Sequence, residues 1–374
     1  MGIEIATKKN RWASKCSLLC VLHMRNDLVP FVAELNRFGF RFDKMTIIGV
    51  PYSSKGPARD ELSRQGVYAI MPTWDTLDIQ VRTELMRTIQ KCNDDHSQFY
   101  IIEDGGYIVP IIHTNEYTVG IPCCSGAVEQ TAQGVWRDTQ VKKLEIPVWT
   151  LTDSYLKRRV EPPAVAAAIC RSLEIILQEV DLGLTGKTIS VFGFGAIGEN
   201  VANALRSRGN EVRVYDVDPN HMVSAKLQGY TTGTKFDSVS SSDIILGCSG
   251  SQSISLPVFS RVKTGTIFAS CSSKRIEIDT RNLELISSSV KGLTEHIKEY
   301  GLPGKRFVRL ANEGFPINFI TETSLPLEVM DLIYSEMFVC LQHLRRYGST
   351  EIHQLDDNQT MRISKYWLKT HDRK

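Results

Sequence analysis

The sequence has no apolar run long enough to span a membrane, and the basic residues Lys8, Lys9 and Arg11 are not followed by the apolar core of a secretion signal. We therefore expect no membrane segment and a protein that stays in the cytoplasm. The chain also has no large excess of charge of one sign, since its 44 basic residues are nearly balanced by 42 acidic ones. It has no basic block that could release counterions from nucleic acid. Nucleic acid is therefore excluded as an expected partner.

Cysteine pairs typical of metal or redox sites are missing as well. The chain has nine cysteines, but none belongs to a CxxC pair and no pattern of histidine ligands accompanies them. This distribution predicts reduced thiols and no metal site. Internal repeats and low-complexity tracts are also absent.

What is present is an alternation of short apolar runs and helical stretches. A length of 374 residues suits two domains, each large enough for its own core. Residues 28, 31, 32, 35 and 38 are apolar and share one helical face that would pack on a sheet. Candidate strands around this helix cover 18–22, 45–50, 67–71, 100–102 and 148–151. The order predicts a parallel α/β sheet.

Pro162 and Pro163 stop this first pattern and mark the expected hinge between the domains. A helix is expected over 164–180, and a second α/β unit should follow from 187 to about 319. Its candidate strands cover 188–192, 211–215, 243–246 and 266–269. After Pro326 one apolar helical face continues to Gly348, an expected C-terminal cap, and the polar tail beyond shows no clear periodicity.

A glycine-rich loop follows the strand at 188–192 directly and precedes a helix. The pattern GxGxxG alone is weak, but strand, loop and helix come in the order that a dinucleotide site requires. The first glycine permits a tight turn, the second lets a pyrophosphate approach the backbone, and the third allows close contact between helix and strand. The predicted phosphate-binding residues are Gly193, Gly195, Ala196, Ile197 and Gly198.

Asp216 ends the next strand and is the expected ribose ligand. Its carboxylate could accept both ribose hydroxyls and would repel a 2′-phosphate, which favours NAD over NADP. Asp218 is a competing acid, but it lies beyond the strand tip. A tight turn in some other α/β domain is the alternative interpretation of the loop.

We therefore predict an α/β protein with two domains, a Rossmann-type NAD-binding domain and a Rossmann-like substrate domain. The substrate domain is expected at 1–157, the NAD-binding domain at 158–321, and a C-terminal helix and tail at 322–374 that return to the substrate domain. The active site should lie where the two domains face each other.

Six ordered segments between Leu18 and about Met330 resemble motifs of the S-adenosylhomocysteine hydrolase family. Residues 20–24 (CVLHM) are similar to its CLHM strand end, 102–106 (IEDGG) to LDDGG, and 126–131 (GAVEQT) to GxSEET. Residues 152–161 (TDSYLKRRVE) resemble NDSxTKxxxDN, 216–219 (DVDP) resemble EIDP, and 312–318 (NEGFPIN) resemble AEGRLVNL. Six motifs in order are far more specific than any one of them.

The resemblance implies an NAD-dependent reaction on a nucleoside-like substrate. In it, the ribose 3′-hydroxyl is oxidised, a base removes the acidified C4′ proton, the group at C5′ is expelled, water adds, and NAD is regenerated. The implied catalytic residues are Lys157 and Glu161 near the 3′-hydroxyl, with Asp104 and His23 around C4′ and C5′. The implied substrate contacts are Asp27, Gln130 and Met330, and further cofactor contacts are Thr131 and Asn318. A homo-oligomer, a dimer or tetramer, is also implied.

Departures from the family motifs bear on the expected reaction. Ser273 stands where the family has a catalytic histidine, Leu325 where it has a substrate-contacting histidine, and Arg25 where it has a small polar residue. We therefore expect elimination (dehydration) or hydration at C5′ in preference to ordinary S-adenosylhomocysteine hydrolysis. Two alternatives stay open, a dehydrogenase with net hydride transfer and a non-catalytic regulatory relative that binds NAD.

Each implied catalytic residue also has a structural interpretation. His23 at a strand end could be an ordinary hydrogen-bonded core histidine, and Asp104 before two glycines could be a turn residue. Lys157 precedes Arg158 and Arg159 and could belong to a solvated basic run.

Overall fold

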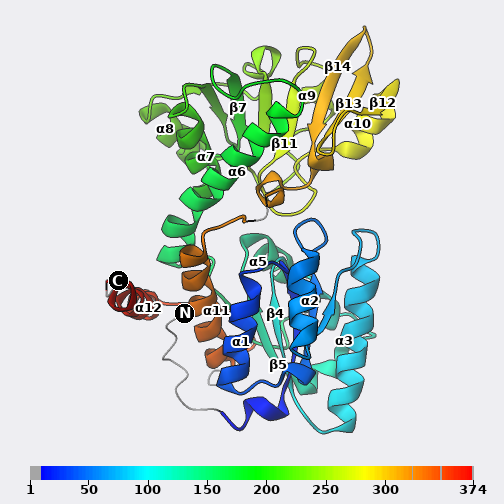
Figure 1. Ribbon diagram of the computed structural model, residues 1–374, viewed down its shortest axis with the longest axis vertical. Helices are drawn as coiled ribbons and strands as arrows, with labels where there is room; N and C mark the ends of the chain where they lie inside the picture. The colour runs from blue at the N-terminus through cyan, green and yellow to red at the C-terminus, as the bar shows by residue number, and fades with distance from the viewer. Residues whose placement is uncertain (1–9, 322, 346–347, 373–374) are drawn as a thin grey trace. The chain divides into compact units, whose positions relative to one another are not determined.

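The computed structural model describes residues 10–321, 323–345 and 348–372, which divide into two compact units (Figure 1). One unit combines Met1–Arg158 with Leu327–Lys374, and the other is Arg159–Pro326. Within the described ranges, none of the helices has the length and apolarity needed to cross a membrane. The α/β class with a Rossmann-like sheet in each unit is as the sequence predicts.

The first unit is built on a seven-stranded parallel sheet. Its strands are β1 (Ser17–Leu22), β2 (Met45–Gly49), β3 (Tyr68–Ile70), β4 (Phe99–Glu103), β5 (Cys124–Glu129), β6 (Val148–Thr150) and β15 (Ile352–Gln354). They lie in the order β15-β6-β5-β4-β1-β2-β3, and every ladder is parallel. Strand order therefore reverses between β1 and β4, where doubly wound sheets bind their ligands.

The described residues of the first unit form helices, several of which pack on this sheet through apolar faces. They are α1 (Leu28–Phe38), α2 (Gly56–Arg64), α3 (Leu77–Asp94), α4 (Ile108–Ile112), α5 (Ala132–Asp138), α11 (Leu327–Leu344) and α12 (Asp357–His371). Shorter turns are η2 (Ala13–Lys15), η3 (Phe42–Lys44), η4 (Thr118–Cys123) and the π-helical η5 (Leu156–Val160). The five apolar residues of α1 that share a face are all buried, which confirms the helical periodicity.

The second unit contains an eight-stranded mixed sheet. Its strands are β7 (Thr188–Phe192), β8 (Glu211–Tyr215), β9 (Thr231–Thr232), β10 (Ile244–Gly247), β11 (Ile267–Ser270), β12 (Ser289–Gly292), β13 (Ile297–Leu302) and β14 (Arg306–Ala311). The order is β12-β13-β14-β11-β10-β7-β8-β9, with β13 antiparallel to both of its neighbours. The parallel part reverses direction between β7 and β10, which defines the ligand-binding edge of this sheet.

Both faces of this second sheet are buried. Ile244 and Leu246 pack into one apolar cluster with α6 and α7, while Ile245 and Phe268 pack into another on the opposite face. Burial on two faces explains why the strands read as continuous apolar runs. The helices are α6 (Glu161–Gln178), α7 (Ala196–Arg206), α8 (Pro219–Leu227), α9 (Leu256–Phe259) and α10 (Thr280–Ile286), with short turns η6 (Val239–Ser241), η7 (Asn312–Gly314) and η8 (Ile317–Phe319).

Three local expectations are wrong. Helix α6 begins at Glu161, because Pro162 and Pro163 occupy its first turn, where a missing N–H costs nothing. Helix α11 ends at Leu344, ahead of the expected cap at Gly348. The C-terminal tail is not irregular but forms β15 and α12, because Asp356 and Gln359 form a capping box at the start of α12.

Candidate active site

The glycine-rich loop of the second unit lies at the carboxyl end of β7. Gly193 has a φ of 100°, and a Cβ there would lie 2.5 Å from the carbonyl oxygen of Cys248. A Cβ on Gly198 would lie 1.9 Å from the carbonyl oxygen of Gly193, whereas a Cβ on Gly195 would meet no atom within 4 Å. The loop is therefore tightly packed at its ends and open at its centre, as a pyrophosphate site requires.

Ala196 and Ile197 form the first turn of α7, which begins directly after Gly195. Amide N–H groups in a first turn have no acceptor within their helix, and the helix dipole favours an anion beside them. The loop and this turn thus offer one anion site built from backbone groups.

Asp216 connects the end of β8 to the glycine loop. Its Oδ2 accepts a hydrogen bond from the amide of Phe194 at 2.5 Å and contacts His221 Nδ1 at 3.1 Å. Its Oδ1 accepts from the amide of Asp218 at 2.8 Å. Asp218 instead caps α8 by accepting from the amide of Asn220. Of the two acids, Asp216 is the one whose carboxylate is at the loop.

Asn318 is buried in η8, near the carboxyl end of the same sheet. An isolated bridge pairs Pro316 with Ser270, the last residue of β11. The segment that contains Asn318 therefore lies beside the end of β11, at the same edge of the sheet as the glycine loop.

His23 and Asp104 follow β1 and β4, the two strands between which the first sheet reverses order. His23 Nε2 lies 3.3 Å from Asp104 Oδ2, and Nδ1 contacts the Ser53 hydroxyl. Ser53 in turn donates to the carbonyl of Val50 at 3.1 Å. Burial lowers the pKa of His23, and Asp104 acts in the opposite direction. A ring between a hydroxyl and a buried carboxylate is suited to accept or pass a proton.

Lys157 lies in the π-helical turn η5, close enough to His23 that its positive charge helps to lower the pKa of that ring. The backbone of this turn is fixed, since the amide of Lys157 donates to Ser154 Oγ at 3.0 Å and Ser154 Oγ donates to Glu336 Oε2 at 2.8 Å. The first unit therefore brings His23 and Asp104 into contact, and the charge of Lys157 acts on the same ring. Glu161 belongs to the second unit, where it is buried at the start of α6.

Asp27 contacts α11, the helix that contains Met330. Tyr334 donates a hydrogen bond to Asp27 Oδ2 at 2.7 Å and stacks on Phe31. Met330 is buried one turn before Tyr334 on the same helix face. Arg25 is buried nearby and donates to the carbonyl of Ser53 at 3.1 Å.

Gln130 and Thr131 follow β5, and the glutamate before them has a role that sequence analysis did not assign. Glu129 accepts from the amides of Gly105 and Gly106 at 3.0 and 2.7 Å and from the amide and hydroxyl of Thr131 at 2.7 Å each. It thus ties the loop after Asp104 to the cap of α5. The glutamate in GAVEQT was the available signal, but a buried partner across the sheet cannot be inferred from one motif.

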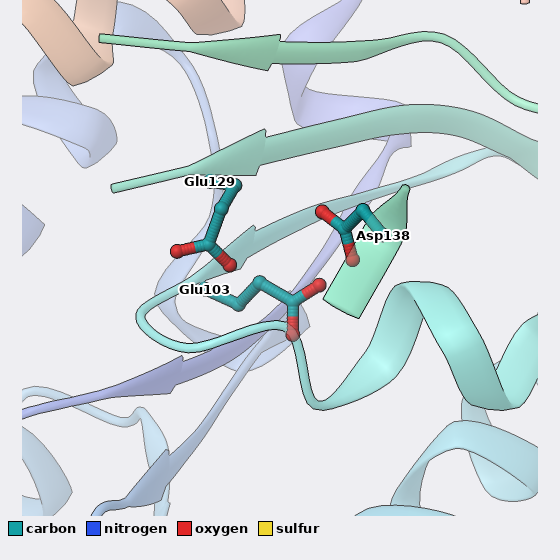
Figure 2. A group of neighbouring side chains, drawn as sticks. All are labelled: Glu103, Glu129 and Asp138. Carbon is teal, nitrogen blue, oxygen red and sulfur yellow. The ribbon is translucent and has the colours of Figure 1, made fainter. Parts of the chain in front are cut away.

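Glu103, Glu129 and Asp138 form a buried carboxylate cluster, and Figure 2 shows the three side chains directed toward one another. Glu103 accepts from the amides of Tyr107, Ile108 and Val109 at the start of α4. Burial raises the pKa of Glu129 to about 8, and the charges of Glu103 and Asp104 act in the same direction. Backbone amides donate hydrogen bonds to the carboxylates of both glutamates, so the cluster holds the loops around Asp104 in place.

Gly134 should be sensitive to any side chain, because a Cβ there would lie 2.0 Å from Glu129 Cδ. We expect Gly134→Ala to destabilise the first unit by about 1–3 kcal/mol, the usual cost of overpacking. All five tryptophans lie in the first unit, so urea unfolding followed by tryptophan fluorescence reports on it alone. Gly56→Ala is the matched control, since nothing lies within 4 Å of its added Cβ. Equal unfolding midpoints for the two variants would contradict the proposed packing.

Comparison with known families identifies the second unit. Residues 169–324 match the sequence model of the S-adenosyl-L-homocysteine hydrolase, NAD binding domain. The second unit is an NAD-binding domain. Its cofactor is NAD, and the open centre of the loop at Gly195 fits the pyrophosphate of that cofactor.

Relatives extend this similarity into the rest of the chain. The chain is 26% identical to adenosylhomocysteinase of Thermotoga maritima over 93% of its own length and 85% of the relative's. It is 26% identical to adenosylhomocysteinase of Aeropyrum pernix over 72% of its length, and to S-inosyl-L-homocysteine hydrolase of Methanocaldococcus jannaschii over 67%. These two matches span only 66% and 60% of the relatives' lengths. The comparisons support a relationship to the S-adenosylhomocysteine hydrolase family.

Asp216 is expected to select NAD in this NAD-binding domain. Loss of hydrogen bonds to a charged group costs about 1.5–3 kcal/mol, so Asp216→Ala should weaken NAD binding by about 10- to 150-fold. Asp218→Asn is the control, because an asparagine still caps α8. Calorimetric titration with NAD and NADP measures the effect. Tighter binding of NADP than of NAD by the unmodified protein would rule out this role.

Proposed function

We propose that the chain is an NAD-dependent enzyme resembling S-adenosylhomocysteine hydrolase, which acts on a nucleoside-like substrate. It oxidises the sugar 3′-position, removes the C4′ proton and eliminates or adds a group at C5′, with NAD regenerated in each cycle. The observation that carries the proposal is the contact of His23 with Asp104 at the switch point of the first sheet, with the Lys157 charge beside it.

Each group has a proposed task. When bound, NAD supplies the acceptor for the two electrons that leave C3′. Lys157 takes the proton of the 3′-hydroxyl, with Glu161 four residues further along the chain as its partner. Asp104 and His23 serve C4′ and C5′, where the imidazole ring accepts or returns a proton. Asp27, Gln130 and Met330 hold the substrate, while Thr131 and Asn318 contact the cofactor.

Cofactor retention tests the proposal. The purified protein is denatured, and the released nicotinamide cofactor is quantified in its oxidised and reduced forms, before and after incubation with adenosine or inosine. Both nucleosides are used because the names of the relatives cover adenosyl and inosyl substrates. We expect retained NAD, part of which becomes reduced on incubation without accumulation of free NADH.

Two outcomes would favour the alternatives. Stoichiometric release of NADH would indicate a dehydrogenase with net hydride transfer. Thermal stabilisation by NAD and nucleoside, with no reduction of the cofactor, would indicate a non-catalytic relative.

A further inference from the structure

Two thiols lie side by side at the carboxyl end of the second sheet. Cys248 directly follows β10 and Cys271 directly follows β11, and these parallel strands pair Gly247 with Ser270. The amide of Cys271 donates to the carbonyl of Gly247 at 2.8 Å, so the pairing continues to the cysteines themselves. Both side chains pack against the same apolar cluster and therefore lie on the same face of the sheet.

Strand geometry brings this pair into the range of a disulfide. Neighbouring strands lie about 4.7–4.9 Å apart, and disulfides join residues whose Cα atoms are about 4.4–6.8 Å apart. Cys248 together with burial raises the pKa of Cys271 well above its usual range. Bond formation therefore requires movement of side chains and no change of register.

A buried glutamate holds the two strand ends in this arrangement. Glu277 accepts from the amide of Gly250 and from the Ser272 hydroxyl, at 2.6 Å each, and from the Ser253 hydroxyl. One carboxylate thus ties the loop after Cys248 to the loop after Cys271. The two loops cannot separate without breaking these bonds.

The pair also touches the cofactor loop. The carbonyl of Cys248 would lie 2.5 Å from a Cβ on Gly193, and the Cys248 Cβ would lie 3.3 Å from one on Gly198. Two of the three glycines that shape the NAD phosphate site, Gly193 and Gly198, therefore pack against Cys248. A disulfide at Cys248 therefore constrains a residue that packs directly against the phosphate-binding loop.

We propose that Cys248 and Cys271 are a redox pair that forms a disulfide and thereby weakens NAD binding. With a peroxide as oxidant, the half-buried Cys248 sulfur attacks the O–O bond, giving a sulfenic acid and one water. The buried Cys271 sulfur then attacks the sulfenic sulfur, forming the S–S bond and releasing a second water. Hydrogen peroxide is reduced to two waters while two thiols are oxidised to one disulfide.

Disulfide formation and NAD binding must affect each other to the same extent, because the two equilibria are thermodynamically linked. Coupling between two sites is typically about 5- to 150-fold, so we expect the disulfide form to bind NAD at least about 5-fold more weakly. Saturating NAD must then favour the dithiol by the same factor. For a two-electron couple a 5-fold change corresponds to about 20 mV in reduction potential.

Peptide mapping after peroxide treatment tests the linkage. Trypsin places Cys170, Cys248 and Cys271 on three separate peptides, 160–171, 236–261 and 264–274. We expect a 236–261 to 264–274 crosslink that is 2 Da lighter than the two free peptides together and is reversed by dithiothreitol. Cys248→Ser must abolish it, whereas Cys170→Ser, the matched control in the same cluster, must retain it.

Titration of the oxidised and reduced full-length protein with NAD tests the consequence. A crosslink between 160–171 and 264–274, or none, would overturn the pairing, because Cys170 is the other thiol whose charge acts on Cys271. Equal NAD affinity of the dithiol and disulfide forms would overturn the control of binding. Cys248→Ser must show the same NAD affinity before and after peroxide, which separates the disulfide from general oxidative damage.

Discussion

Lys157→Ala is expected to bind NAD normally yet to reduce it about 10²–10⁴-fold more slowly when a nucleoside is added, the usual contribution of a general base. The reason is geometric as well as chemical, because the backbone of Lys157 is held by Ser154 and its charge acts on His23. Stopped-flow absorbance of the reduced nicotinamide in a single turnover measures the rate.

Arg158→Ala is the matched control, because Arg158 lies in the same turn but is exposed and 3.8 Å from Asp153. An exposed ion pair of this kind contributes little, so this variant should reduce NAD at the unmodified rate. An equal loss in both variants would favour the solvated basic run as the explanation. An unchanged rate in Lys157→Ala would remove that residue from the mechanism.

The NAD-binding part of the fold was predictable because local signals agree there. Strands β7 and β8 have the expected bounds, and the other predicted strands differ by one residue at most at either end. An apolar run, a glycine loop that tolerates no Cβ at Gly193 or Gly198, and a helix follow one another within a few residues. No long-range information was needed to place that loop.

Elements that depend on distant partners were missed. Strand β15 is three residues long and is defined by its ladder to β6, some two hundred residues away in the sequence. Strands β12 and β13 are stabilised by pairing at the edge of a mixed sheet, and β12 is exposed throughout. Short strands of this kind show no periodicity in the sequence, because pairing with distant strands determines whether they form.

The candidate site was predicted as residue types but not as a network. His23 and Asp104 were singled out from two motifs that are eighty residues apart, and only strand order brings them together. The contacts of Glu129 with the amides of Gly105 and Gly106, and of Ser53 with His23, join residues that follow different strands. Such contacts depend on register, which one sequence does not reveal.

By the motif resemblance, Ser273 stands where the family has a catalytic histidine, and under the proposed function this difference is expected to separate two steps of the reaction. Ser273 is half-buried in the loop after β11, and Leu325 packs against the apolar cluster of the second unit. A serine hydroxyl without a partner cannot act as a general acid or base near neutral pH, so protonation of a departing thiolate should be slow. Under the proposed function, proton removal at C4′ depends on Asp104 and His23, which are in contact.

We therefore expect the protein to exchange the C4′ hydrogen of adenosine-like nucleosides with solvent deuterium, which NMR can monitor. Incubation with S-adenosylhomocysteine should release little thiol. A loss of about 10²–10⁴-fold relative to an enzyme with the histidine is the contribution of one general acid or base. Ser273→His should raise thiol release only in part, because by the motif resemblance Leu325 stands where the family has its substrate-contacting histidine. Rapid thiol release by the unmodified protein would make it an ordinary hydrolase with substituted residues. Absence of exchange with every nucleoside would leave the dehydrogenase or the non-catalytic alternative.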